Sequence, residues 1–176
     1  MSTTTEVAAA RKPWRLSTNG RRVVLICHIA SAGSWLGIDV AMAVLIGTAK
    51  FTGDLQVRAS SLRVLEIVTV WPLLVCGLIC LGTGVLLGLG SRWGLVKYWW
   101  VLTKLVLNLL LTTLVVVALQ FEVAEQARRA SLVLNGRLVP LDLSNLIYPP
   151  VVSPAALLIA TILSVVKPWG RVRKTI

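Results

Sequence analysis

The chain has 176 residues, of which 56% are hydrophobic and 14% are charged. A soluble globular domain carries about 25% charged residues, so this composition excludes an ordinary water-exposed surface. The length suits one domain, and the mean hydropathy of +0.82 predicts that this domain lies in a lipid bilayer.

The formal net charge of +11 does not indicate nucleic-acid binding. A nucleic-acid-binding protein gathers its basic residues on one accessible face. Here Lys and Arg stand in short clusters between long apolar runs, which is typical of residues that orient a membrane protein. We expect membrane lipids as partners, and no nucleic acid.

Residues 1–22 are polar and predict a flexible tail, and four apolar runs follow. We expect transmembrane helices over residues 23–49, 62–89, 95–119 and 148–166, which together form an all-α four-helix bundle over residues 23–166. The first run is too long for a signal peptide, so we expect it to remain as an uncleaved span. Pro72 is expected to kink the second helix. Residues 167–176 form a basic tail.

The connection over residues 120–147 is the only long one. Residues 121–129 have a helix-favouring composition that can continue the third helix. Asn135-Gly136 stands between apolar pairs, and both residues tolerate a positive φ. We predict a small extracytoplasmic β-hairpin here, with an irregular loop containing one turn as the alternative.

Lysine and arginine predict the orientation of the bundle. Eleven of them lie on the side that holds both chain ends: Arg11, Lys12, Arg15, Arg21, Arg22, Arg92, Lys97, Lys167, Arg171, Arg173 and Lys174. Six lie on the other side: Lys50, Arg58, Arg63, Arg128, Arg129 and Arg137. We therefore expect both termini in the cytoplasm of a bacterium, with the chain in its plasma (inner) membrane.

Small residues predict where the helices pack. Gly33 and Gly37 in the first span, and Gly84 and Gly88 in the second, have the G-x-x-x-G spacing that lets membrane helices approach closely. We expect the first two helices to pack tightly together or against a partner protein.

Ionisable residues inside a span are candidates for function. From a rise of about 1.5 Å per residue, Asp39 and Glu66 are expected at similar depth near the external side, with Arg63 within reach and Asn108 slightly deeper. This cluster could bind a lipid headgroup, an ion or a partner; the alternative is a structural ion pair between helices.

Two further polar residues, His28 and Lys104, fall in the cytoplasmic half. We expect Lys104 to extend its amine toward the cytoplasm or to lie near His28, rather than to pair with Asp39.

Metal and haem chemistry has little support in the sequence. His28 is the only histidine, so a haem with two histidine ligands would have to be shared with a second chain. Cys27, His28, Cys76 and Cys80 could hold Cu(I), but no C-x-x-C or Met-rich motif is present. The alternative is that the cysteines are small buried side chains. We expect no cofactor, and no enzyme motif is found.

Three segments of the chain resemble a known family. The first is His28 followed by Ser34-Trp-Leu-Gly37, and the second is Gly82-Thr-Gly84. The third is the run from Ser91 to Leu105, which contains Trp93-Gly-Leu95, Trp100-Val101 and Lys104-Leu105. These resemble a bacterial family of four-span integral membrane proteins of unknown function, loosely similar to membrane proteins linked to copper uptake. The resemblance covers about the first three spans, and the composition looks actinobacterial.

Three functions remain open. We prefer a non-enzymatic accessory or scaffold subunit of a larger inner-membrane complex, because the chain is small, lacks motifs and has glycines suited to helix packing. Its partners would be other membrane subunits or further copies of itself. The alternatives are a small-solute or ion transporter acting as a homo-oligomer, and a haem- or copper-handling membrane protein.

Overall fold

The computed structural model describes residues 16–91, 94–168 and 170–172. Four helical segments in this part of the chain are long and apolar enough to cross a membrane: Thr18–Phe51, Leu55–Leu89, Trp99–Leu134 and Asn145–Val166. The described residues contain no β-strand. The expected all-α membrane fold with four spans is therefore confirmed.

The first two spans are single helices, α1 (Thr18–Phe51) and α2 (Leu55–Leu89). Ser17 caps α1 by accepting a hydrogen bond from the Gly20 amide, and Asp54 caps α2 by accepting from the amides of Gln56 and Val57. Each helix is about 50 Å long at 1.5 Å per residue, against a hydrocarbon core of about 30 Å. Both therefore tilt or extend beyond the bilayer.

The third span is longer than the expected 95–119. It begins with α3 (Trp99–Leu114), passes through one π-helical turn, η1 (Val115–Leu119), and continues as α4 (Gln120–Leu134). The helix-favouring composition of residues 121–129 indicated this continuation. The connection to the fourth span is accordingly shorter than the expected 120–147.

The predicted β-hairpin is wrong. Leu132 lies in α4, and Asn135-Gly136 ends that helix. The Gly136 amide donates to the Val133 carbonyl over 2.9 Å, and the Arg137 amide donates to the Leu132 carbonyl over 3.0 Å. This is a Schellman helix end, which needs a positive φ just as a hairpin turn does, and Gly136 has a φ of 81°. Asn135 and Gly136 therefore form a turn, as expected, but it ends a helix and does not connect two strands.

The fourth span follows an irregular segment over residues 137–144. A 3-10 turn, η2 (Asn145–Ile147), leads into α5 (Pro149–Val166). Pro149 stands at the first helical position, where a backbone N–H would have no acceptor within the helix, so the absence of this group in proline costs nothing. The helix ends at Lys167, whose φ of 49° is left-handed.

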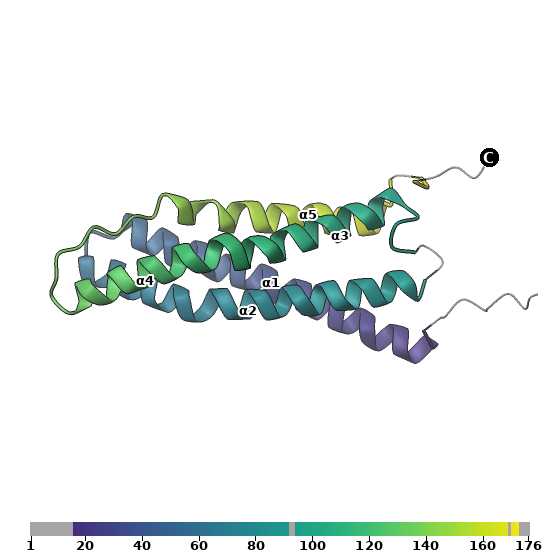
Figure 1. Cartoon of the computed structure of the whole chain (residues 1–176), viewed down its shortest axis with the longest axis horizontal. Helices are drawn as coiled ribbons and strands as arrows, with labels where there is room; N and C mark the ends of the chain where they lie inside the picture. Colours follow the sequence, from purple (N-terminus) through teal and green to yellow (C-terminus); the bar gives the residue numbers. More distant parts are fainter. Residues whose placement is uncertain (1–15, 92–93, 169, 173–176) are drawn as a thin grey trace, which may run out of the picture.

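The four spans form one elongated antiparallel bundle (Figure 1). The start of α1 and the end of α5 lie at the same end, which we call the terminal end. The segment between α4 and α5 lies at the opposite end, which we call the loop end. The start of α1 stands well away from α5 at the terminal end, so these two helices diverge there (Figure 1).

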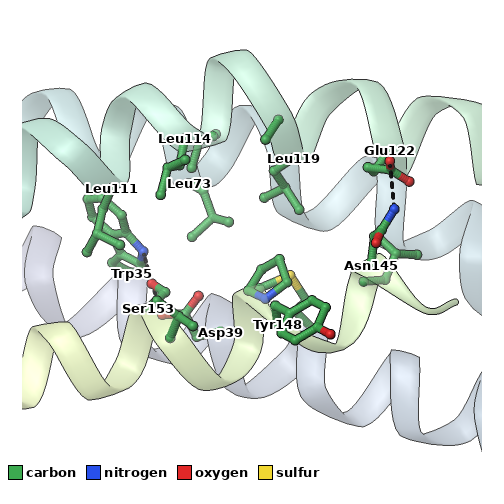
Figure 2. A pocket seen from close by; sticks show the side chains of 16 residues that line it. Trp35, Asp39, Leu73, Leu111, Leu114, Leu119, Glu122, Asn145, Tyr148 and Ser153 are labelled. Carbon is green, nitrogen blue, oxygen red and sulfur yellow. Dashed lines mark hydrogen bonds between the residues drawn. The ribbon is translucent and has the colours of Figure 1, made fainter.

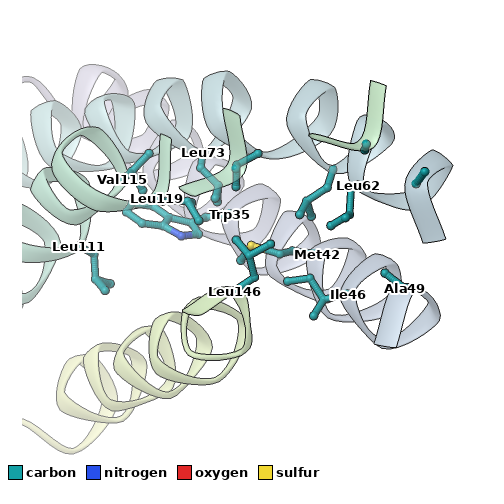
Figure 3. Packing of buried hydrophobic residues seen from close by; sticks show 14 of the residues in the cluster. Trp35, Met42, Ile46, Ala49, Leu62, Leu73, Leu111, Val115, Leu119 and Leu146 are labelled. Carbon is teal, nitrogen blue, oxygen red and sulfur yellow. The ribbon is translucent and has the colours of Figure 1, made fainter. Parts of the chain in front are cut away.

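The buried core lies in the loop half of the bundle. On α1 its first member among the described residues is Trp35, and it extends through Met42 and Ile46 to Ala49 (Figure 3). Ala49 meets Arg58 at the loop end, where the guanidinium donates to the Ala49 carbonyl over 2.9 Å. The buried hydrophobic cluster is thus concentrated in the loop half of the bundle.

One close contact between helices is made at Gly77, which lies outside the two G-x-x-x-G pairs. A Cβ atom added to Gly77 of α2 would stand 2.8 Å from both Trp35 and Thr112, so three spans meet there. Gly33 and Gly37 of α1 are exposed, and an added Cβ would meet nothing within 4 Å. They therefore make no close α1–α2 contact among the described residues.

The second glycine pair does pack inside the chain. An added Cβ would lie 3.3 Å from the His28 ring at Gly84, and it would overlap the Leu95 side chain at Gly88. Gly84 therefore leaves room for His28, and Gly88 leaves room for Leu95 in the segment before α3.

Candidate functional site

The described residues form a cavity in each half of the bundle. The first, the Lys104 cavity, has a volume of about 480 Å³ and lies where α1 diverges from α3 and α5. Most of its lining is apolar, and the polar side chains are few. They are His28 of α1, Lys104 and Asn108 of α3, and Thr161 and Ser164 of α5.

His28 is held by the neighbouring helix α2. Its Nδ1 atom lies 3.0 Å from the Cys80 carbonyl oxygen and 3.0 Å from the Thr83 hydroxyl oxygen. A carbonyl oxygen only accepts, so Nδ1 carries the hydrogen and donates it. The ring is thereby fixed in one orientation at the wall of the cavity.

Lys104 joins α3 to α5. Its amine donates to the Ser164 hydroxyl over 2.9 Å and lies 4.8 Å from the centre of the Trp100 ring. No salt bridge to an acidic side chain is found for Lys104 among the described residues. The Lys104 amine, the one Lys or Arg group among the described residues that line this cavity, is thus held by a neutral hydroxyl and an aromatic ring.

The second cavity, the Asp39 cavity, has a volume of about 330 Å³ and lies toward the loop end between α1, α5 and the α3–η1–α4 span (Figure 2). The Asp39 carboxyl at its wall is fully buried. Ser153 donates to its Oδ2 atom over 2.7 Å, and the Trp35 ring nitrogen donates to the Ser153 oxygen over 2.9 Å. Asp39 Oδ1 has no hydrogen-bond partner among the described residues.

The charged side chains that line the Asp39 cavity are acidic. They are Asp39 and Glu122, and the described residues of the lining include no Lys, Arg or His. Glu122 accepts a hydrogen bond from the Asn145 amide over 3.1 Å and stands near the loop end of the cavity (Figure 2). The remaining walls are almost entirely apolar.

The structure divides the cluster expected from Asp39, Arg63, Glu66 and Asn108. Arg63 and Glu66 pair with each other, 2.5 Å apart, on a partly exposed face of α2. Asn108 lines the Lys104 cavity and accepts from Thr112 over 3.4 Å. Depth along the bundle alone could not separate these residues, because it does not say which face of each helix they occupy.

Several residues of the site were not expected. Ser153 and Glu122 carry no motif, although a serine within the apolar run of α5 is a recognisable sign of a polar contact between helices. Trp35 stands four residues before Asp39, which places both on one face of α1. The π-helical turn, whose Val115 and Leu119 line the Asp39 cavity, has no signal in the sequence.

The residues considered as Cu(I) ligands do not converge. Cys80 Sγ lies 3.7 Å from His28 Nδ1, but Cys27 is exposed. Among the described residues, no group of three or more His, Cys, Asp or Glu side chains is placed to hold a metal ion.

Comparison with known proteins gives one match. A family model described as "Predicted integral membrane protein (DUF2269)" matches residues 22–168. No curated protein matches. No solved structure matches. The expected resemblance to a family of predicted integral membrane proteins is confirmed, while the bacterial origin and the similarity to copper-uptake proteins stay predictions.

Proposed function

This chain belongs to the DUF2269 family of predicted integral membrane proteins, and we propose that it is a non-enzymatic accessory or scaffold subunit of a larger membrane complex. In this proposal a transmembrane helix of a partner subunit docks in the Lys104 cavity. The observation that carries the proposal is Lys104 itself, which lines this opening without an acidic partner among the described residues.

A charge in this position has an energetic consequence. Insertion scales assign a lysine at the centre of a membrane span a cost of about 2.5–3.5 kcal/mol. Lys104 lies nearer the start of its span, which begins at Trp99, so its cost is smaller, but charged residues within a span usually pair with another charge. The Ser164 hydroxyl and the Trp100 ring stabilise the amine without neutralising it. An Asp or Glu on a partner helix would supply the missing negative charge.

The walls of the cavity suit a helix. Small residues line it on two sides, namely Ala32 and Gly33 on α1 and Ala156 and Ala160 on α5. Small side chains let helix backbones approach closely in a bilayer, where apolar burial alone gives no driving force. Gly37 extends this open surface along α1, since an added Cβ there meets nothing within 4 Å.

The orientation forms part of the proposal. Both described chain ends lie at the terminal end, and the eleven basic residues counted for that side favour the cytoplasm of a bacterial plasma membrane. The docked helix would then pair with Lys104 in the cytoplasmic half of the bilayer.

The test combines co-purification with photo-crosslinking. We expect the wild-type chain, purified from its native membrane in mild detergent, to bring down a stoichiometric membrane protein with an acidic residue in a span. Lys104→Met should lose this partner, and Lys104→Arg should keep it. The matched control is Lys97→Met, because Lys97 is an exposed lysine outside the cavity.

A photo-crosslinking amino acid shows where on the chain the partner binds. In place of Gly33, which lines the Lys104 cavity, it should form an adduct with the same partner. In place of Ile67, on an exposed face of α2, it should form none. A partner that survives Lys104→Met contradicts the docking site. Purification of the wild-type chain alone contradicts the accessory role, and an adduct with a second copy favours a homo-oligomer.

A further inference from the structure

We propose that the Asp39 cavity binds an amphiphilic organic cation of the alkylamine type. The ammonium group would donate to Asp39 Oδ1, and the hydrocarbon chain would lie between α5 and the α3–η1 segment. This site differs from the Lys104 cavity in place, in charge and in the kind of ligand.

The first support is an unsatisfied carboxylate oxygen. Asp39 is one of the residues that line the cavity and is fully buried. Ser153 occupies only its Oδ2 atom, and Oδ1 has no partner among the described residues. Buried polar atoms in folded proteins nearly always have a hydrogen-bond partner, and exceptions require an explanation. A ligand with an N–H group would complete this carboxylate.

The second support is the hydrogen-bond chain behind the carboxylate. The Trp35 ring nitrogen donates to Ser153, and Ser153 in turn donates to Asp39. Ser153 donates to the Oδ2 atom and so orients the carboxyl group, while Trp35 in turn orients Ser153. The Oδ1 atom of the same carboxyl group has no partner among the described residues.

The third support is the sign of the charges. Both carboxyl groups that line the cavity, Asp39 and Glu122, are negative when ionised, and none of the described lining residues is basic. An anionic ligand would meet uncompensated repulsion here. A cation would be attracted first by Glu122 near the loop end and then by Asp39.

Aromatic rings and apolar walls complete the site. Trp35 and Tyr148 line it, and aromatic faces attract organic cations. Leu111, Leu114 and Leu119 form an apolar wall opposite Asp39 (Figure 2). The volume of about 330 Å³ is at the lower end of the range for small-molecule sites, which fits a compact amphiphile.

The cavity is accessible from the lipid phase. Leu114 and Ala118 on one side and Tyr148 and Val152 on the other are exposed residues of its lining. An amphiphile dissolved in the bilayer can therefore reach it between these helices. The π-helical turn contributes to this opening, and such turns are frequent at functional sites.

The experiment measures binding of radiolabelled octylamine to the full chain in lipid nanodiscs, with empty nanodiscs as the background. We expect saturable binding at one site per chain, and we expect octanol and octanoate at equal concentration not to displace it. Asp39→Asn keeps the size of the side chain and should weaken octylamine binding at least tenfold. Glu122→Gln should weaken it less.

Matched controls separate this site from other charges. Glu66→Gln removes a carboxyl group on the α2 surface and should leave binding unchanged, as should Lys104→Met. Leu114→Trp fills the cavity without altering its charge and should abolish binding, which keeps the test valid if Asp39→Asn does not fold. Folding of each variant is checked by size-exclusion chromatography and circular dichroism.

Three results would overturn the proposal. They are the absence of saturable octylamine binding, equal binding by folded Asp39→Asn, and displacement by octanol as effective as that by unlabelled octylamine. Because Lys104→Met tests the partner helix separately, failure of one proposal leaves the other standing.

Discussion

Ser153 of α5 donates its hydroxyl hydrogen to Asp39 of α1 over 2.7 Å, which joins the first and last spans across a separation of 114 residues. The same hydroxyl oxygen accepts from the Trp35 ring nitrogen. One serine therefore satisfies two buried polar groups of α1. Without it, a carboxylate and an indole N–H would both be left without a partner in the core.

Replacing Ser153 by Ala should destabilise the bundle. A buried polar group that loses its partner costs about 1–3 kcal/mol, and here two groups lose theirs. We expect a lower midpoint of thermal unfolding in detergent, followed by circular dichroism. Thr161→Val is the control on the same helix, because the exposed Thr161 hydroxyl bonds only to the Leu157 carbonyl of its own helix. An equal loss in both variants would contradict the importance of this contact.

Gly77 should tolerate a side chain less well than Gly33. An added Cβ at Gly77 would stand 2.8 Å from Trp35 and from Thr112, whereas the space beside Gly33 is open. Gly77→Val should therefore cost about 1–3 kcal/mol through overpacking and reduce the folded yield in detergent. Gly82→Val is the control, because nothing lies within 4 Å of a Cβ there. A folded yield of Gly77→Val equal to that of Gly82→Val would be the contrary result.

The glycine spacing suggests that a side chain would be tolerated least at Gly33 and Gly37, whereas the contacts within this chain place the least tolerant position at Gly77. The G-x-x-x-G pattern identifies a helix face with room for close approach, but it does not say which helix arrives. In this structure the face of Gly33 and Gly37 is open, and Gly77, outside any such pair, takes the close contact. Among the described residues nothing lies within 4 Å of a Cβ added at Gly33 or Gly37, so packing of this face against a partner protein stays a prediction.

The number and order of the spans could be predicted because each one is a long apolar run, and a bilayer requires such runs. The continuation of the third span through Gln120–Leu134 was harder to predict, because α4 is amphipathic and does not continue the apolar run of α3. Asn135-Gly136 shows a more general limit. A positive φ serves a hairpin and a helix end equally, so only the preceding helix decides between them.

The candidate site shows the same limit. Asp39 was identified as a polar residue in the membrane, yet its partner Ser153 lies on α5 and depends on how four helices rotate about their axes. Rotation follows from packing contacts between distant residues, such as Trp35 against Gly77. Sequence spacing gives depth to within a turn, and depth alone grouped Asp39 with Glu66, which faces elsewhere.

Gly136 should be required for the end of α4. Its φ of 81° is strained for a residue with a side chain, and left-handed backbone costs such residues about 1–2 kcal/mol. Gly136→Ala should lower the thermal midpoint in detergent by a corresponding amount. Gly53→Ala, in the turn between α1 and α2, should have a smaller effect, since Gly53 is not among the positive-φ residues. Equal effects would show that the helix end does not contribute.

The segment after α4 should respond to acid through Asp142. The Asp142 carboxylate accepts from the Ser144 hydroxyl and from the Ser144 amide, and these bonds lower its pKa below the ordinary value of about 4. The contribution of a group with a lowered pKa is complete above its unfolded pKa and is lost as the pH falls through its folded pKa. The turn at residues 142–144 should therefore hold at neutral pH and loosen only in acid.

The measurement is the amide signal of Ser144 by nuclear magnetic resonance in micelles. Its chemical shift should titrate with a midpoint below 4, because protonation of Asp142 breaks the bond that this amide donates. Asp142→Asn should abolish the titration, and Asp54→Asn, which alters the cap of α2, should leave it unchanged. The backbone of Asp142 also donates to the buried Gln126 side chain, so the segment should stay attached to α4 in acid. A midpoint above 4 would mean that Ser144 does not stabilise the charged carboxylate.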